Sequence, residues 1–122
     1  MALALNAPLG GVITNEGRVD AKALARQIDV SMPTIAMVLG KSPRFLNDYP
    51  TPKSAQRRAL TLVDRVNGLA GELGGLKFAI VWLKTPMREL GGRSALEALA
   101  GTDDAFAAAI GFIDDFLSAV PD

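Results

Sequence analysis

Neither cysteine nor histidine occurs among the 122 residues of this chain. These absences exclude disulfide bridges, thiolate nucleophiles, zinc sites built from cysteine and histidine, and Ser-His-Asp catalysis. No stretch approaches the roughly 20-residue apolar run that a membrane span requires, and Met1 to Gly11 lack the basic start of a signal peptide. An isolated carboxylate pair is the main catalytic route left, and nothing in the sequence pattern indicates one. We therefore expect a cytoplasmic protein that binds no cofactor or metal and is not an enzyme.

The charges are few and unevenly distributed, although basic and acidic residues both number 13. From Arg18 to Arg65, nine basic residues stand against four acidic ones, whereas from Val66 to Asp122 four basic residues stand against eight acidic ones. A basic half followed by an acidic half indicates either two surfaces with different partners or a chance partition of solvated charges.

Strand patterns are weak, so the sequence predicts an all-α fold. Residues 1–17 are predicted to form a flexible N-terminal arm, because proline and glycine interrupt them. We then expect a helix-turn-helix region over residues 18–74 and a small helical domain for partner binding or dimerisation over 75–122.

Individual helices are marked by their capping residues. Asp20 can cap a helix that runs through Ile28, and Ser31 can cap a second helix from Met32 to Leu39 that Gly40 ends. The prolines of residues 41–52 predict a loop, which Phe45, Leu46 and Tyr49 pin to the core. Further helices are predicted over 54–73, 76–84, 94–100, the last of which opens with a Ser-x-x-Glu capping box, and from 102 to 120.

Asp20 to Arg44 has the pattern of a DNA-binding helix-turn-helix. Ala25 is small where the helices would cross, Asp29 tolerates the left-handed turn, and Ile35 would seat the second helix. The residues that face the major groove are then Ser31, Met32, Thr34 and Met37, none of which can make a bidentate base contact. The same unit could instead serve only as scaffold or as a dimer surface. Phosphate contacts are predicted for Arg26, Lys41, Arg44, Lys53, Arg57 and Arg58.

Two apolar stripes run along the last predicted helix. Phe106, Ile110, Ile113 and Leu117 form one, while Ala109, Phe112, Phe116 and Val120 form the other. One stripe can face the chain's own core, and the second predicts contact with another polypeptide. The alternative is that one small domain buries both.

A motif before that helix resembles a known family. Residues 81–99 read VWLKTPMRELGGRSALEAL, which is similar to the C-terminal toxin-binding domain of the Xre/MbcA/ParS antitoxins. Together with the helix-turn-helix, the resemblance covers nearly the whole chain from Asp20. Met87 replaces the usual asparagine and Ala95 the usual proline, and both changes affect the shape of the turn.

The resemblance implies a type II antitoxin that is a homodimer, assembles with a RES-domain toxin that degrades NAD, and represses its own operon by binding operator DNA. In such proteins the last helix and tail approach the toxin's active-site cleft. An acidic helix end suits a cleft that binds the phosphates of NAD. The expected toxin contacts are Arg93, Phe112, Asp115, Phe116, Leu117, Val120 and Asp122. A stand-alone transcriptional regulator, whose C-terminal half only dimerises, is the alternative.

Overall fold

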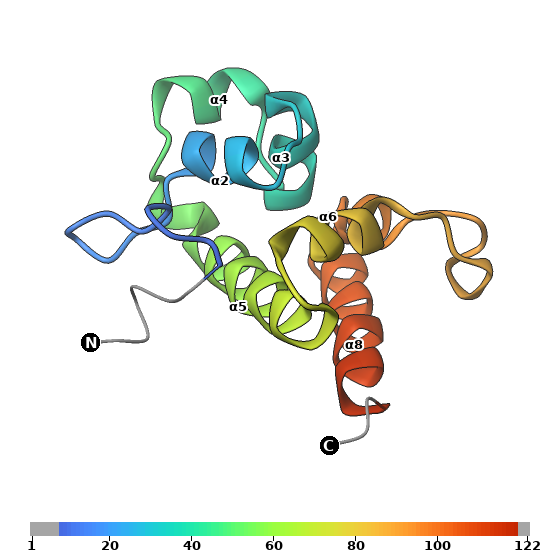
Figure 1. The fold of residues 1–122 in the computed structure, drawn as a ribbon. Coiled ribbons are helices and arrows are strands. Elements are labelled where there is room, and N and C mark those ends of the chain that lie inside the picture. The colour runs from blue at the N-terminus through green and yellow to red at the C-terminus, as the bar shows by residue number, and fades with distance from the viewer. Residues whose placement is uncertain (1–7, 120–122) are drawn as a thin grey trace.

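The computed structural model describes residues 8–119, and every regular element in this range is a helix. The predicted all-α fold is therefore confirmed (Figure 1). The elements are α2 (Ala21–Gln27), α3 (Met32–Leu39), α4 (Pro43–Asp48), the 3-10 turn η1 (Lys53–Ala55), α5 (Gln56–Leu73), α6 (Leu76–Lys84), the 3-10 turn η2 (Arg88–Leu90), α7 (Ala95–Leu99) and α8 (Asp103–Ala119).

The described part of the expected flexible arm is packed instead of loose. Leu9 and Val12 are buried, and the amide of Leu9 donates a 3.0 Å hydrogen bond to Oδ1 of Asn67 on α5. Ile13 and Val19 form an antiparallel bridge that closes a turn at Gly17. Leu9 and Val12, on either side of Gly10 and Gly11, decide this outcome, because they can enter the core while the glycines bend the chain.

The predicted loop over residues 41–52 also needs correction, because α4 occupies its middle. The hydroxyl of Ser42 accepts the amide of Phe45, and Pro43 stands in the first turn, where its missing N–H costs nothing. Of the three residues expected to pin this segment, only Leu46 enters the core. Tyr49 is 62% exposed and packs at a tilt against the ring of Phe45, which is also exposed.

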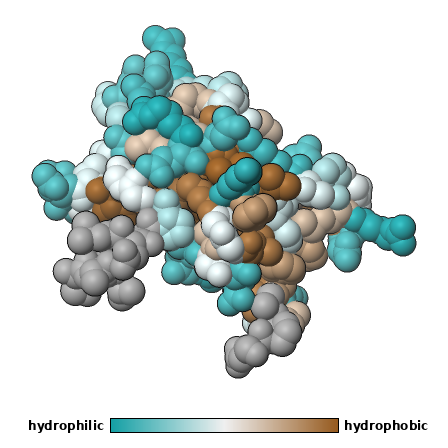
Figure 2. Space-filling view, in the orientation of Figure 1, coloured by the Kyte–Doolittle hydropathy of each residue, from teal (hydrophilic) through white to brown (hydrophobic). Residues whose placement is uncertain are grey.

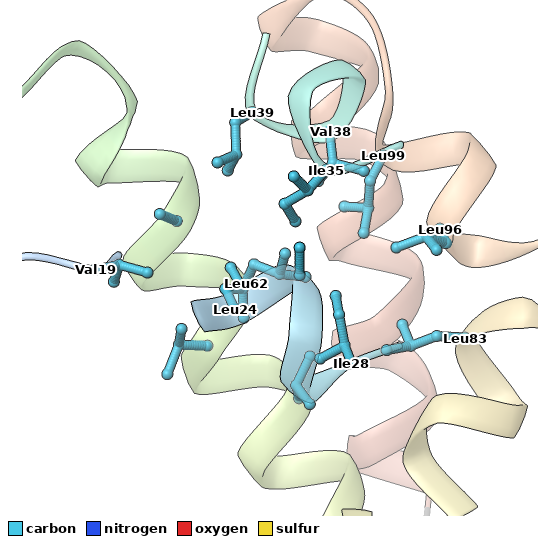
Figure 3. Packing of buried hydrophobic residues seen from close by; sticks show 14 of the residues in the cluster. Val19, Leu24, Ile28, Ile35, Val38, Leu39, Leu62, Leu83, Leu96 and Leu99 are labelled. Atoms are coloured by element: carbon cyan, nitrogen blue, oxygen red, sulfur yellow. The ribbon is translucent and has the colours of Figure 1, made fainter. Parts of the chain in front are cut away.

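One core joins the two predicted halves of the chain, so it does not follow the boundary that we expected at residue 75. The long helix α5 packs against both α6 and α8, and α3 contacts α7. Figure 3 shows Ile35 and Val38 of α3 pointing toward Leu99 of α7. At the other end, the ammonium of Lys84 donates to the backbone carbonyl of Asp29 in the α2–α3 turn.

The segment between α6 and α7 extends away from the body of the fold (Figure 1, orange). It turns back on itself through Gly91 and Gly92, whose φ angles of 70° and 85° are left-handed. Ser94 and Glu97 then form the predicted capping box, in which each side chain accepts the other residue's amide. In the part of the chain that the structure describes, no helix is long and apolar enough to cross a membrane.

Candidate functional site

The α2–α3 pair is built by local signals. The carboxylate of Asp20 accepts hydrogen bonds from the amides of Lys22 and Ala23 at the start of α2. Similarly, the side chain of Ser31 caps α3 by accepting a hydrogen bond from the amide of Thr34. Between the helices Asp29 adopts φ 57°, the left-handed conformation that such a tight turn requires. The two helices contact each other, and Ala25 of α2 is buried.

A narrow strip of α3 remains open to solvent. Ser31, Pro33 and Met37 are exposed, and Thr34 is partly exposed, whereas Met32 packs against the core. The other side of α3 is covered, because Ile35, Ala36, Val38 and Leu39 are all buried. The structure therefore brings Ser31, Thr34 and Met37 together on one strip and gives Met32 a packing role.

The expected phosphate contacts lie around the end of α3. Arg44 and Arg57 are exposed on α4 and α5, while Lys41 places its ammonium 5.7 Å from the ring centroid of Phe45. Lys41, Ser54 and Arg57 line one side of a groove of about 650 Å³, and Asp103 and Asp104 at the start of α8 line the same groove. Acidic residues therefore border part of this basic surface. Arg26 is exposed separately, at the end of α2.

Arg58 does not take the phosphate-contacting position that we expected. Its side chain is 14% exposed, and its guanidinium donates to the carbonyls of Val38, at 3.1 Å, and Gly101, at 3.0 Å. It also pairs with Asp103 at 2.8 Å and lies 5.0 Å from the ring centroid of Phe106. The hydrogen bond from Arg58 holds the pKa of Asp103 below its ordinary value. Arg58 therefore joins α3, α5 and α8, and the prediction of a phosphate contact is wrong for this residue.

The second stripe of α8 is largely covered by the chain's own α6. Phe112 and Phe116 are half-buried and pack on the indole of Trp82, with centroid distances of 6.0 and 4.8 Å. Leu117 is half-buried over Gly68 of α5, so closely that a Cβ there would lie 3.3 Å from Leu117 Cδ1. These three residues therefore have packing roles within the chain, and α8 leaves less apolar surface open than its sequence predicted.

Two of the large apolar side chains that are open to solvent lie on α6. Phe78 is 53% exposed and Val81 is 59% exposed. Figure 2 shows apolar side chains running over α6 and down along α8. We call Phe78, Val81, Trp82, Phe112 and Phe116 the α6–α8 face. Sequence reasoning missed Phe78 and Val81, although a helix that is apolar on all sides was the signal that could have found them.

The acidic residues of α8 have different surroundings. Asp114 pairs with Arg65 of α5 through hydrogen bonds of 2.6 and 3.2 Å, and this contact raises the pKa of Arg65 above its ordinary value. Asp115 is exposed. Val120 and Asp122, the last two expected toxin contacts, lie outside the described residues.

Arg93, an expected toxin contact, is exposed and lies close to α3. It lines a groove of about 430 Å³ together with Thr34 and Met37 of α3 and with residues of α7. The structure thus brings it to the exposed strip of α3.

Clusters of acidic or buried polar side chains give little sign of a catalytic or metal site in the described residues. Within residues 8–119, no group of three or more acidic side chains could hold a metal ion. Ser94, a buried polar side chain, is occupied as a helix cap. Comparison of the chain with models of protein families, with curated proteins and with solved structures finds no significant match.

Proposed function

We propose that this chain is the antitoxin of a type II toxin–antitoxin system. In this proposal it acts in the cytoplasm, binds a RES-domain toxin that degrades NAD, and represses its own operon by binding operator DNA. It acts by binding alone, as a homodimer that assembles further with its toxin. The motif in residues 81–99 and the α2–α3 pair are the sequence features that support this function.

One structural observation carries the proposal: two unlike surfaces lie on different elements of one fold. The basic residues near the strip of α3 are Arg44 and Arg57, which are exposed, and Lys41, which is partly exposed, and they suit a phosphate backbone. The α6–α8 face is apolar and aromatic, with Phe78 and Val81 open to solvent, as expected for the centre of a protein–protein contact. A protein that links DNA to a second protein needs both kinds of surface.

In this mechanism the toxin covers the α6–α8 face while the acidic end of α8 approaches its active site. Asp115 is exposed close to that end, and a cleft that binds the phosphates of NAD has to be electropositive. Phe78 and Val81 then supply the apolar anchor that we had assigned from the sequence to α8 alone. Val120 and Asp122 remain expected contacts.

The test is co-expression with a RES-domain toxin, preferably the product of a neighbouring gene. We expect Phe78→Asp to abolish co-purification and to restore toxicity in a growth assay, because a carboxylate would be buried without a partner. Tyr49→Asp is the matched control, since it places the same charge at an exposed aromatic position directly after α4. Neutralisation of the toxin by a folded Phe78→Asp variant would contradict this placement of the interface.

A stand-alone regulator is the second candidate, and one observation favours it. Trp82 and Gly68 already receive the aromatic and aliphatic side chains at the end of α8, so that helix needs no toxin to cover it. In this case the α6–α8 face joins two copies of the chain. Phe78→Asp would then convert a dimer into a monomer, as measured by light scattering. Neither the wild type nor the variant would neutralise the toxin.

A further inference from the structure

The exposed strip of α3 lacks the side chains that usually read DNA sequence. Ser31, Thr34 and Met37 carry hydroxyl and thioether groups, and none can donate two parallel hydrogen bonds to one base. A helix with this surface, by itself, would hold DNA mainly through the phosphate contacts of its neighbours.

An arginine from the other half of the chain lies at this strip. Arg93 lines the groove of about 430 Å³ with Thr34 and Met37, and the groove is completed by Val38 and by residues of α7. The side chain is exposed, and its one hydrogen bond within residues 8–119 is a long contact of 3.4 Å from Nε to the carbonyl of Leu90. Both terminal nitrogens of the guanidinium are therefore free, within that range, to bind a ligand.

The backbone that carries Arg93 is fixed on both sides. Its carbonyl accepts the amide of Met87 at 3.0 Å, and the amide of Gly92 donates to the carbonyl of Met87 at 2.9 Å. On the other side, the capping box of Ser94 and Glu97 begins α7 directly after it. An arginine held in this way loses less conformational freedom on binding than one on a mobile loop.

The chemistry of the groove favours the edge of a base pair over a phosphate. Glu97 lines the groove beside Arg93, and its pKa is held below the ordinary value by hydrogen bonds from Ser94. This carboxylate would repel a phosphate. A guanidinium matches the O6 and N7 acceptors of guanine, and the apolar walls formed by Met37, Leu96 and Ala100 match a thymine methyl group.

We propose that Arg93 is a specificity-determining residue that reads guanine in the major groove from the gap between α3 and α7. The assignment rests on the proposed DNA-binding function and adds to it: the half of the chain thought to serve the toxin also supplies the sequence-reading side chain. Lysine cannot replace it fully, because an ammonium lacks the two parallel donors of a guanidinium.

The test is selection of bound duplexes from a random DNA library by the full-length chain. We expect the wild type to enrich a motif with an invariant guanine, and Arg93→Ala to lose the preference at that position alone. Binding to the selected duplex should weaken about 10- to 100-fold, as for loss of one bidentate base contact, with an unchanged dependence on salt. Arg88→Ala, an exposed arginine in η2 of the same turn, is the control and should select the wild-type motif.

The outcomes separate the two proposals. If the wild type selects a motif and Arg93→Ala selects the same one, the role of Arg93 is wrong while DNA binding stands. If the wild type binds without sequence preference, the role of Arg93 is also wrong. A wild type that binds no DNA would overturn both. Arg93→Ala that retains its motif but no longer co-purifies with the toxin would return this residue to the role expected from the resemblance. Circular dichroism checks that each variant is helical.

Discussion

Replacing Arg58 with alanine should destabilise the fold and leave DNA binding by the folded chain intact. The bond to the Val38 carbonyl is partly buried, and a hydrogen bond from a charged donor contributes about 1.5–3 kcal/mol. The guanidinium over the ring of Phe106 adds about 0.5–1 kcal/mol. Water can replace the arginine at the exposed carbonyl of Gly101. We therefore expect the free energy of unfolding, measured in urea by circular dichroism, to fall by about 2–4 kcal/mol.

The neighbouring arginine provides the matched control. Arg57 is exposed and its guanidinium makes no hydrogen bond within residues 8–119, so Arg57→Ala should change the free energy of unfolding by less than about 0.5 kcal/mol. If Arg57 contacts a phosphate, its loss should reduce the slope of log K against log salt by about 0.9. The two substitutions thus predict opposite results in the two assays. An Arg58→Ala protein with wild-type stability and a reduced salt slope would refute the structural role.

Three further predictions concern other elements. Leu46→Ala should lower the free energy of unfolding by about 2–5 kcal/mol, because it leaves a cavity in the core. Tyr49→Ala, at an exposed site, should change it by less than about 0.5 kcal/mol. Equal losses for the two variants in urea unfolding would show that α4 is packed differently. Asp29→Ala should cost about 1 kcal/mol in a thermal melt because φ is 57° there, and Asp29→Gly should be tolerated; the reverse order would argue against strain in the turn. Hydrogen bonds from Ser94 lower the pKa of Glu97 from its ordinary 4.5, so their stabilising effect is present above pH 4.5 and is lost as the pH falls through the lowered value. Glu97→Gln keeps the capping box but should weaken this pH dependence in unfolding curves recorded between neutral and acid pH, and an unchanged curve would contradict the assignment.

Local signals explain why much of the fold is predictable from the sequence. The predicted helices over 32–39 and 76–84 have the observed bounds. The first is capped by Ser31 and ended by Gly40, and the second follows Gly75 and ends before Pro86. The left-handed Asp29 and the capping box at Ser94 are equally local. Each of these features depends on residues within one or two turns of chain.

The candidate surfaces were harder to predict because they depend on contacts between distant residues. The sequence shows that Arg57 and Arg58 are both basic, but only the packing of α3 and α8 turns one inward. The ammonium of Lys84 reaches the carbonyl of Asp29 across 55 positions of sequence, a contact that no local pattern indicates. Similarly, the stripe on α8 is visible in the sequence, whereas the side chain that covers it, Trp82, lies on another helix.

Helix α3 packs against both halves of the chain, and this affects how the protein is degraded. Because α3 shares its buried side chains with α7 as well as with α5, the chain is expected to lose its structure in one cooperative step rather than half by half. A ligand at either surface would then protect the entire chain, since anything that binds only the native state lowers the unfolded fraction. If the proposed DNA binding holds, a bound duplex would in this way also slow proteolysis of the α6–α8 face.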